Sequence, residues 1–573
     1  MLNKEIAQQL DKIADYLEME EIDYKPFAYR RASSSISELS EDIEEIYEEK
    51  GREGIEEING VGKNIADKIE EFILTGEMEY LENLKAKFPV DLDNLLRVEG
   101  LGPKSIKKLF KELNVRNLSD LEKATKEGEI ASLSGFGEKT EKNIREAIEF
   151  LKKDEGKWLL GEVFSDSEAI FSRLEKLKET EKISFAGSLR RKKETVGDVD
   201  ILVSAKKAEE IIDCFVGYEG VLKTLSKGET RSSIRLKSGF NVDLRVVGKN
   251  SFGSALQYFT GSKEHNIKLR RIANEKGMKL NEYGLFKDGR RVAGREEEKI
   301  YSLLGLSFVP PELREDRGEV EAYLKGEELE LVTQKDIKGE LHMHTTWTGG
   351  AQTVEEMAKR GEELGYEYIG IADHTEFLRI ENGLNAEDLE KQRAEIKEVD
   401  AMMKIKIFQG CEANILKDGS LDIDDEALEK LDYVIAGIHS NFKMDREEMT
   451  ARVVKAIKHP LVKIISHPTG RLIKRRESLD LDMVAIFNEA KKAGVVLEIN
   501  SSPHRLDLRD TDIKRCVEMN IPMIINSDAH HVDQLENISF GIGQARRGWA
   551  EKKNIINSKS KEELKKFFKS DEN

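Results

Sequence analysis

The chain has 573 residues, too many for one hydrophobic core, so several domains are expected. Hydrophobic residues make up 39% and charged residues 36%, the net charge is −18, and the three cysteines form no CxxC pair. The distant cysteines argue against a disulfide framework, and no segment of the sequence approaches a membrane-spanning length. These features favour a cytoplasmic protein, and the negative net charge means that any contact with nucleic acid would depend on local basic surfaces and on salt.

Residues 1–150 are predicted to form short amphipathic helices joined by glycine turns. A Gly-apolar-Gly turn occurs there three times, each time after an apolar residue and before a lysine-containing helix. The copies are Gly60-Val61-Gly62, Gly100-Leu101-Gly102 and Gly135-Phe136-Gly137. Glycines let the backbone approach an anion closely, and the next helix offers free N–H groups. One copy would also fit a plain helix cap, but three predict helix-hairpin-helix motifs that grip DNA phosphate without reading sequence.

From about residue 180 the pattern changes to strands, with segments at 183–189, 198–204, 233–238 and 240–247. Asp198 and Asp200 alternate along one of them, so both carboxylates face the same side. Asp243 lies on a later strand that can pair alongside. Three such carboxylates can hold two Mg²⁺ or Mn²⁺ ions that activate a primer 3′-hydroxyl group. Alone, the first two aspartates would equally fit strand-end carboxylates that face water.

A glycine-serine turn precedes these carboxylates. Gly187 and Ser188 are followed by Arg191, so amides, a hydroxyl group and a guanidinium group are available to a triphosphate. Together with the three aspartates, this turn resembles the nucleotidyltransferase signature of family X DNA polymerases such as DNA polymerase beta. The resemblance implies that the aspartates are the catalytic metal ligands. It also implies that Ser188, Arg191 and the Gly197 amide hold the triphosphate.

A downstream segment is similar to the sugar pocket of the same family. It comprises Tyr258-Phe259-Thr260-Gly261-Ser262 and the later Asn266. The resemblance implies that Tyr258 and Phe259 pack under the deoxyribose, that Asn266 contacts the base edge in the minor groove, and that Arg270 contacts the template side. Asn241 departs from the family, which often has a basic residue beside the third aspartate. Weaker positioning of that aspartate or of the primer end is therefore an open alternative.

The resemblance extends to the N-terminal helices. Residues 60–69 are similar to the deoxyribose-phosphate lyase region of polymerase beta, and Lys68 aligns with its Schiff-base lysine. An amine there can attack the C1′ aldehyde of an abasic sugar, and the imine then promotes β-elimination. The alternative is a solvated lysine on a charged helix, and Asn64 replaces a lysine that often assists. Phosphate contacts are expected from Tyr29, Arg30 and Arg31.

Histidines concentrate in the C-terminal region. The chain has ten, nine of them after residue 340, and six follow apolar runs spaced by roughly one βα unit. The six are His342, His344, His374, His439, His467 and His530. Glu412 ends a similar run, and residues 495–500 form another run without histidine. Seven strands whose ends converge at the mouth of a βα barrel would gather these side chains into a site for several divalent metal ions.

This arrangement resembles the PHP (polymerase and histidinol phosphatase) domain, a distorted seven-stranded (β/α)7 barrel with a trinuclear metal site. The resemblance implies two or three Zn²⁺ or Mn²⁺ ions. Eight residues match the nine ligand positions: His342, His344, His374, Glu412, His439, His467, Asp528 and His530. The ninth is normally an aspartate, but Gly349 stands in its place. Because glycine has no side chain to coordinate, one metal position is expected to be weaker or empty.

The resemblance covers the whole chain and predicts a multidomain α+β protein. The expected regions are a lyase-like helical domain with a helix-hairpin-helix motif (1–85), a fingers-type helix-hairpin-helix domain (86–150), a nucleotidyltransferase palm (151–250), a thumb (251–315), a linker (316–336) and a metal-dependent PHP phosphoesterase barrel (337–573). The expected partners are gapped or primed DNA and dNTPs, and the chain is expected to be a monomer.

Three functions remain open from the sequence. The first is a template-directed DNA polymerase that fills short gaps in base excision repair and whose barrel processes 3′ ends as a 3′→5′ exonuclease. The second keeps the polymerase but makes the barrel a metal-stabilised structural module, because Gly349 removes a ligand. The third is a small-molecule phosphatase tethered to DNA, against which the intact set of aspartates argues.

Overall fold

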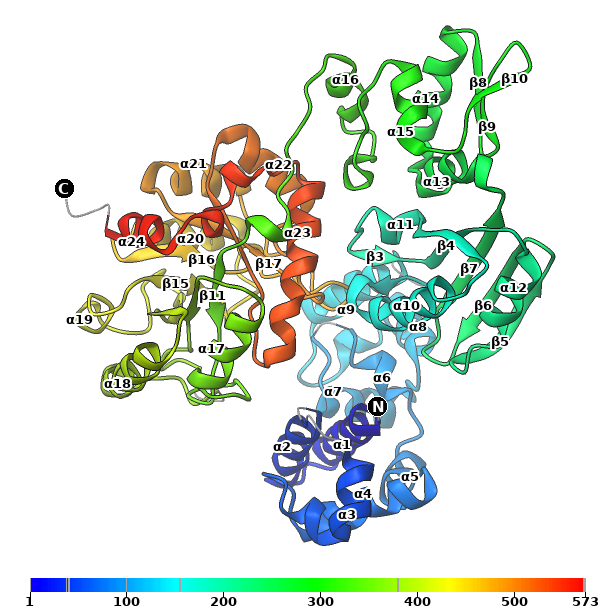
Figure 1. Cartoon of the computed structure of the whole chain (residues 1–573). Coiled ribbons are helices and arrows are strands. Elements are labelled where there is room, and N and C mark those ends of the chain that lie inside the picture. The colour runs from blue at the N-terminus through cyan, green and yellow to red at the C-terminus, as the bar shows by residue number, and fades with distance from the viewer. Residues whose placement is uncertain are drawn as a thin grey trace. The chain divides into compact units, whose positions relative to one another are not determined.

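The computed structural model describes residues 2–37, 39, 42–98, 100–153, 156–378 and 381–569, and the chain divides into two compact units. One is Met1–Glu155 with Lys474–Glu477, and the other is Gly156–Ile473 with Ser478–Asn573. Helices build the described part of the first unit, whereas the second combines mixed and parallel sheets with helices (Figure 1). This confirms the predicted multidomain α+β class.

The first unit holds the predicted helices joined by tight turns. They are α1 Leu2–Met19, α2 Lys25–Ser37, α3 Ile43–Glu56, α4 Lys63–Thr75, α5 Glu79–Lys87, α6 Leu92–Leu95, α7 Pro103–Leu113, α8 Leu118–Glu127 and α9 Glu138–Lys153. Local sequence sets their ends. Asn117 caps α8 by accepting a hydrogen bond from the Asp120 N–H at 3.0 Å, and Gly128 ends it in the left-handed region. Their apolar faces form one hydrophobic core from Ile6 to Leu151.

A five-stranded mixed sheet forms the centre of the predicted palm. Its strands are β2 Thr180–Phe185, β4 Asp198–Ala205, β5 Val221–Lys227, β6 Arg231–Leu236 and β7 Asn241–Val247, in the order β2-β4-β7-β6-β5. β4 and β7 are parallel and the other neighbours antiparallel. Helices α10 Leu160–Glu175 and α12 Ala208–Val216 pack with the sheet. The first predicted strand ends at Phe185, because Gly187–Arg190 turns into the short helix α11.

The predicted thumb follows as a helical segment with a small antiparallel sheet. It contains α13 Phe252–Thr260, α14 Lys263–Glu275, β8 Met278–Asn281, β9 Gly284–Lys287, β10 Arg290–Ala293, α15 Glu297–Leu304 and α16 Glu319–Leu324. Glu297 is buried and accepts hydrogen bonds from Arg190 at 2.7 Å and from Arg314. This buried ion pair ties the thumb to helix α11 of the palm.

The C-terminal region is the predicted barrel. Its parallel strands are β11 Gly339–Met343, β12 Tyr368–Ile371, β13 Lys406–Gln409, β14 Glu412–Asn414, β15 Val434–Gly437, β16 Val462–Ile465, β17 Val496–Asn500 and β18 Met523–Asn526. Bridges between Met343 and Ala529 and between His374 and Glu412 close the ring. The predicted strand 405–412 is split at Gly410 and Cys411, and β13 pairs with β12 whereas β14 pairs with β15, so the two share one position of the seven-stranded ring. A Cβ at Gly410 would collide with the Tyr433 ring.

The barrel interior is filled by side chains from its strands. Leu341, Tyr368, Phe408, Ile435, Ile464, Val496 and Ile524 form one buried cluster. Phe568 of the C-terminal helix α24 Lys561–Lys569 stacks on Tyr433 at 5.2 Å and closes one end of this cluster. Outer helices cover the strands: α17 Val354–Glu363, α18 Ala386–Met402, α20 Arg446–Ile457, α21 Met483–Ala493, α22 Asp510–Met519 and α23 Ile538–Arg547. Because the interior is packed, chemistry is confined to the strand ends.

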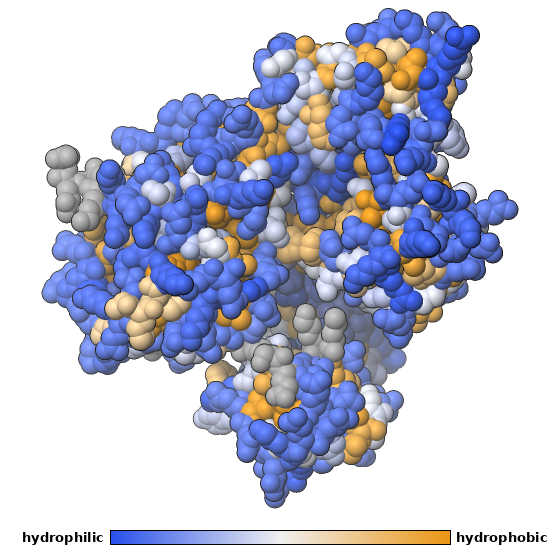
Figure 2. Space-filling view, in the orientation of Figure 1, coloured by the Kyte–Doolittle hydropathy of each residue, from blue (hydrophilic) through white to orange (hydrophobic). Residues whose placement is uncertain are grey.

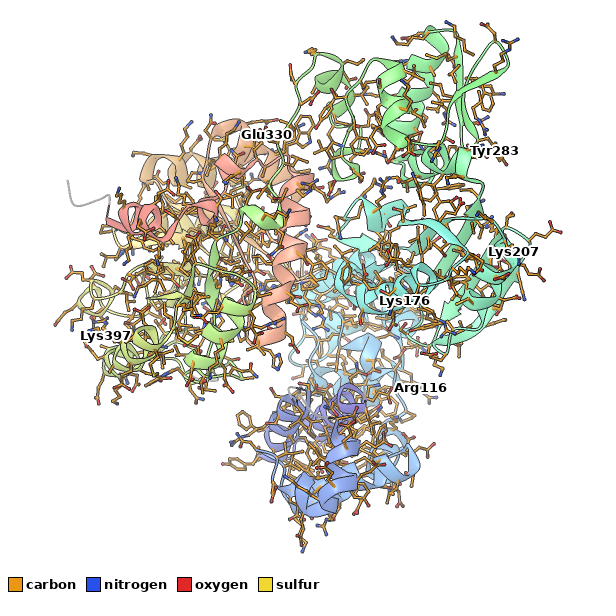
Figure 3. The ribbon with its side chains drawn as sticks, in the orientation of Figure 1. Arg116, Lys176, Lys207, Tyr283, Glu330 and Lys397 are labelled. Atoms are coloured by element: carbon orange, nitrogen blue, oxygen red, sulfur yellow. The ribbon has the colours of Figure 1, made fainter. Side chains whose placement is uncertain are left out.

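The surface agrees with the composition. The face in Figure 2 is mostly hydrophilic, with small hydrophobic areas between charged side chains. Charged side chains such as Lys207 and Lys397 point outward into solvent (Figure 3). None of the helices within the described ranges is both long and apolar enough to cross a membrane.

Candidate active sites

The three aspartates of the palm meet at one end of the sheet. The parallel register of β4 and β7 pairs Asp200 directly with Asp243, as the sequence pattern predicted. Asp198 precedes Asp200 by two residues on the same strand and therefore faces the same side. Asp198 is exposed, whereas the other two are half-buried. The site therefore opens to solvent at Asp198 and is enclosed at Asp200.

Crowding of these carboxylates favours a cation. Burial raises the pKa of Asp200 to about 7, and the negative charges of Asp243 and Asp198 add to the shift, against Arg245 and Arg191. Without metal ions, the carboxylates of this cluster resist ionisation, because burial and mutual repulsion disfavour their charges. Divalent cations supply the opposite charge and therefore bind to the cluster. The donor set of three carboxylates fits Mg²⁺ or Mn²⁺.

Two side chains of the neighbouring strand β6 hold Asp243. The Ser233 hydroxyl donates to one carboxylate oxygen, and Arg231 Nη2 lies 3.3 Å from the other. Asn241 instead accepts a hydrogen bond from Arg235 Nε at 3.0 Å. The basic side chain that the sequence lacks at residue 241 is thus supplied to the third aspartate across the sheet by Arg231.

The turn at Gly187 lies directly against the aspartates. The backbone there has a φ of 58°, and a Cβ would collide with the Asp200 carboxylate. The Ala186 N–H donates to the Asp200 carbonyl at 2.8 Å, which fixes the turn beside the strand. Ser188 is the next residue, half-buried at this turn. Only glycine satisfies both the backbone angle and the close approach.

The predicted sugar-pocket residues are held in one hydrogen-bonded arrangement. Gln257 Nε2 donates to Asn266 Oδ1 at 2.6 Å, and Asn266 Nδ2 donates to the Tyr258 carbonyl at 2.7 Å. The Arg245 guanidinium lies 4.4 Å from the centre of the Phe259 ring. Arg270 is exposed on α14. These contacts fix the orientation of Asn266 relative to the tyrosine.

Arg191 is engaged by the thumb and by the barrel. Its Nε donates to Glu315 Oε1 at 2.9 Å, and its Nη1 donates to the Thr260 carbonyl next to Gly261. Arg547 of α23 donates to the Arg191 carbonyl at 2.8 Å and to Glu315 at 3.0 Å. The arginine expected at the triphosphate is therefore paired with Glu315 in this structure.

The barrel brings all eight predicted ligands to the same end. His342 and His344 lie at the end of β11, and the others follow β12, β13, β15, β16 and β18: His374, Glu412, His439, His467, Asp528 and His530. Glu412 is central. One of its oxygens lies 3.0 Å from Nε2 of His467, and the other lies 3.1 Å from Nδ1 of His374. Asp528 Oδ1 lies 3.2 Å from His344 Nε2.

Unsatisfied polar atoms show that this cluster fits metal ions. Three buried atoms that face one another in the cluster make no hydrogen bond among the described residues: Nε2 of His342, Nδ1 of His374 and Oε2 of Glu412, which lies 3.3 and 3.1 Å from the two nitrogens. Buried polar atoms are normally hydrogen-bonded, so a group of orphans at one point implies an ion. Burial alone would raise the pKa of Glu412, but His439 and His342 hold it well below its ordinary range. The carboxylate is therefore charged and ready to coordinate.

Three overlapping groups have ligand atoms within 4.8 Å of one another. They are His344-His374-His530, His342-His344-Asp528 and His374-Glu412-His439. Imidazole and carboxylate donors at this spacing suit Zn²⁺ or Mn²⁺. Glu498 of β17 supports the cluster by accepting a hydrogen bond from His342 Nδ1 at 2.7 Å. The sequence interpretation named its strand but not its role, because a buried glutamate in an apolar run has no distinctive spacing.

The three N-terminal hairpins share one geometry. In each, the apolar residue between the glycines donates its N–H to a carbonyl three residues earlier: Val61 to Ile58, Leu101 to Val98 and Phe136 to Leu133, all at 3.0 Å. The first glycine has a φ of 80°, 90° and 81° at Gly60, Gly100 and Gly135. The second glycine precedes a helix, and at Gly62 and Gly102 no side chain caps the helix. The free N–H groups thus face outward for a phosphate.

Lys68 and its neighbours lie on the same unit. Lys68 Nζ donates to the Asn64 carbonyl at 2.9 Å and lies 4.8 Å from the centre of the Tyr80 ring, and burial lowers its pKa. Tyr29 is buried and stacks on Tyr80 at 6.4 Å. Lys68 therefore has the lowered proton affinity that a nucleophilic amine needs.

The neighbouring arginines already have protein partners. Arg30 is paired with Asp15 and Glu18, each at 2.7 Å. Arg31 donates to Asn59 at 2.9 Å, beside Gly60. Of the two, only Arg31 lies at a hairpin. The roles of both in DNA binding stay predictions.

Family models match the chain along most of its length. They are a helix-hairpin-helix domain (1–78), a SAM-like helix-hairpin-helix tandem (92–149), a DNA polymerase beta palm (161–234), a DNA polymerase beta thumb (255–315) and a PHP domain (340–502). Their order is the order expected from the motifs.

One relative decides the family. The "DNA polymerase/3'-5' exonuclease PolX" of Bacillus subtilis is 36% identical over 575 residues, which cover 99% of this chain and 100% of that protein. The chain belongs to the PHP-containing family X DNA polymerases. Two proteins called "Probable phosphatase" match only the PHP region. That of Syntrophotalea carbinolica is 26% identical over 38% of this chain and 90% of its own length, and that of Caldicellulosiruptor saccharolyticus is 29% identical over 34% and 80%.

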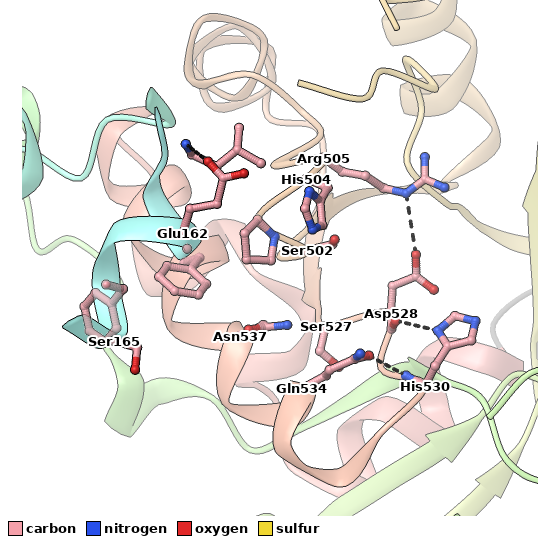
Figure 4. A pocket seen from close by; sticks show the side chains of 15 residues that line it. Glu162, Ser165, Ser502, His504, Arg505, Ser527, Asp528, His530, Gln534 and Asn537 are labelled. Carbon is pink, nitrogen blue, oxygen red and sulfur yellow. Dashed lines mark hydrogen bonds and ion pairs between the residues drawn. The ribbon is translucent and has the colours of Figure 1, made fainter. Parts of the chain in front are cut away.

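As a family X polymerase, the protein acts on DNA and deoxynucleoside triphosphates and depends on divalent metal ions. A pocket of about 590 Å³ lies between α10 of the polymerase palm and the mouth of the PHP barrel (Figure 4). Asp528 and His530 line it, so it opens onto the predicted metal ligands. Arg505 reaches into the same pocket, with its Nε 3.8 Å from Asp528. Arg505 could not be predicted from the sequence, because it lies in a loop without a motif.

Proposed function

We propose that this polymerase fills short gaps in DNA during base excision repair, and that its PHP barrel removes nucleotides from the 3′ end of the same strand. One observation supports the proposed polymerase activity most directly: in the register of β4 and β7, Asp200 pairs with Asp243. The Gly187 turn, which would bind the triphosphate, lies directly against Asp200. The full-length likeness to a protein named for both activities supports the combination.

The palm residues would share the work of nucleotide transfer. Asp198, Asp200 and Asp243 would hold two Mg²⁺ or Mn²⁺ ions, which activate the primer hydroxyl group and neutralise the departing pyrophosphate. Ser188 and the amides at Gly187 and Gly197 would bind the triphosphate. Arg191 would join them after exchanging Glu315 for a phosphate oxygen, because the two acceptors compete for one guanidinium.

The sugar pocket would select and position the nucleotide. Tyr258 and Phe259 lie in contact at 5.1 Å between ring centres and would pack under the deoxyribose. Asn266, held by Gln257 and by the Tyr258 carbonyl, would present its amide to the base edge. Gly261 leaves room beside Arg191, because a Cβ there would lie 3.1 Å from the Arg191 Nη1 atom. Arg270, exposed on the same helix, would contact the template.

The barrel would hydrolyse the 3′-terminal phosphodiester. Its histidines and carboxylates would hold two or three Zn²⁺ or Mn²⁺ ions, which supply a hydroxide and polarise the phosphate. The pocket beside them offers a wall for the terminal base, because Phe164 and Phe540 meet edge to face at 5.4 Å. Arg505 Nη1 is buried there without a hydrogen-bond partner among the described residues and would bind the phosphate.

We further propose that Lys68 gives the protein deoxyribose-phosphate lyase activity, and that the hairpin glycines and Tyr29, Arg30 and Arg31 contact DNA. The lowered pKa of Lys68 supports the first part. The limits of the five domains and of the linker, a monomeric state and a cytoplasmic location are proposals in the same sense.

A 5′-labelled primer annealed across a one-nucleotide gap tests both activities. With dNTPs and Mg²⁺ or Mn²⁺, the wild type is expected to extend the primer by one nucleotide, and Asp200→Ala is expected not to. Without dNTPs, the wild type and Asp200→Ala are expected to shorten it, and His342→Ala is expected not to. Absence of extension by the wild type would refute the polymerase proposal.

The same gel separates the two alternatives for the barrel. A purely structural barrel predicts no shortening by any variant, together with a loss of stability in His342→Ala. A small-molecule phosphatase predicts hydrolysis of p-nitrophenyl phosphate and no action on the primer. The phosphatase relatives support phosphate-ester hydrolysis by the barrel. They match only about a third of the chain, so a phosphatase function would not account for the palm.

A further inference from the structure

The loop that carries Gly349 stands where a ninth metal ligand is expected. The Thr345 N–H donates to Asp373 at 2.8 Å, and the Gly350 N–H donates to the Thr345 carbonyl at 3.0 Å, so buried contacts fix this loop. A Cβ built on Gly349 would lie 3.5 Å from Cδ2 of His530. Residue 349 therefore lies close enough to His530 to place a metal ligand in this cluster, but glycine has no side chain to serve as one.

A different carboxylate occupies the vacated space. The atom nearest to a Cβ on Gly349 is Oε2 of Glu381, in direct collision, and Glu381 Cδ lies 3.1 Å away. Any side chain at residue 349 would displace this carboxylate. A side chain at residue 349 and the Glu381 carboxylate therefore exclude each other from this space.

The backbone brings Glu381 to the site through a loop that doubles back. After His374 the chain returns so that the Leu384 N–H donates to the His374 carbonyl at 2.8 Å. Within the loop, the N–H groups of Glu381 and Gly383 donate to the Leu378 carbonyl at 2.9 and 3.0 Å. Within the described ranges, no hydrogen bond or ion pair ties the Glu381 carboxylate to another side chain. It is available to a cation.

The neighbouring donor group lacks a negative charge. His344, His374 and His530 have ligand atoms within 4.8 Å of one another and include no carboxylate, and His530 is the histidine beside Gly349. The nearest carboxylates to these histidines, Asp528 at His344 and Glu412 at His374, belong to the other two groups, so a fourth, anionic ligand of its own would complete a tetrahedral set here.

We propose that Glu381 is the ninth metal ligand of the PHP barrel. From another loop at the barrel mouth, it supplies the carboxylate that Gly349 cannot. This inference rests on the proposed metal-binding function of the barrel. It changes the expectation drawn from the sequence: the metal position next to His530 is filled through another loop rather than weakened.

Metal binding by the full-length protein tests the proposal without relying on activity. Metal-free protein is titrated with Mn²⁺ by calorimetry, and retained metal is counted by mass spectrometry after desalting. Glu381→Gln is expected to lose one ion per chain, or to bind one ion at least about tenfold more weakly than the wild type. Glu376→Gln, an exposed carboxylate of the same loop, is the matched control and is expected to bind like the wild type.

A double exchange provides the rescue. Gly349→Asp combined with Glu381→Gly moves the carboxylate back to the expected loop and is expected to restore the lost ion, whereas Gly349→Asp alone collides with Glu381. Unchanged stoichiometry and affinity in Glu381→Gln would overturn the proposal, while loss of metal in His342→Ala would still uphold the metal function of the barrel. Absence of metal in the wild type would overturn both.

Discussion

Replacing Asp200 by asparagine is expected to stabilise the metal-free polymerase at alkaline pH. The side chain keeps its size and loses a charge that is half-buried between two other carboxylates. Burial and the neighbouring charges of Asp243 and Asp198 raise the pKa of Asp200 in the folded state to about 7, from an ordinary value of 3.8. The native protein therefore keeps a proton on Asp200 at pH values where the unfolded chain has lost it, so stability falls as the pH rises from about 4 to about 7 and is then constant.

The size of the effect on stability follows from the shift in the pKa of Asp200. Each pH unit between the two pKa values changes the free energy of unfolding by about 1.36 kcal/mol. Between pH 5 and pH 8 the wild type should lose roughly 2–3 kcal/mol that Asp200→Asn does not lose. For a domain of this size that corresponds to a difference in melting temperature of several degrees, on the order of 2–4 °C per kcal/mol.

The measurement is thermal unfolding of both proteins in EDTA at pH 5 and pH 8. Comparing the two pH values removes the constant effect of the substitution itself. Asp213→Asn, an exposed aspartate of the same domain, is the control and is expected to follow the wild type. Mg²⁺ at pH 8 should stabilise the wild type and leave Asp200→Asn nearly unchanged. The same pH dependence in the wild type and Asp200→Asn would refute the argument, because Asp200 would then ionise as in the unfolded chain.

Substitutions at three further residues test other parts of the sites. Arg231→Ala should lower primer extension about 10–100-fold by releasing Asp243, and Arg231→Lys should recover part of it; wild-type rates in both would show that Arg231 has no role. Gly187→Ala should reduce extension at least about a hundredfold while binding to gapped DNA stays constant, since its Cβ displaces Asp200; equal kcat values would contradict this. Lys68→Ala should abolish borohydride trapping of the protein on an abasic 5′-deoxyribose phosphate, and persistent trapping would assign the lyase to another amine.

Local sequence was sufficient for much of the fold and for predicting which aspartates and histidines cluster in the palm and at the barrel mouth. The alternation of Asp198 and Asp200 on a strand and the regular return of histidines after apolar runs are properties of neighbouring residues. The closure of the barrel then brings those residues together automatically, because parallel strand ends share one edge. The three glycine hairpins were predictable for the same reason, since each is complete within a few residues.

Contacts made across the fold were not predictable from one sequence. Arg231 reaches Asp243 through the register of β6 and β7, and Glu381 reaches Gly349 through a loop path that no motif encodes. Strand β5 was missed because it is an exposed edge strand, with Leu222 63% and Leu225 43% exposed, so it shows no alternation of buried and polar residues. These two contacts and this edge strand depend on tertiary structure rather than on local sequence.

The most direct test of two cooperating active sites is a 5′-labelled primer with a mismatched 3′ nucleotide beside a short gap, incubated with all four dNTPs and Mn²⁺. The wild type is expected to remove the mismatch and then extend to fill the gap. Asp200→Ala should only shorten the primer, and His342→Ala should leave the mismatch in place. If His342→Ala corrected and extended the primer as well as the wild type does, the barrel would have no part in 3′-end processing and the account of its function would be wrong.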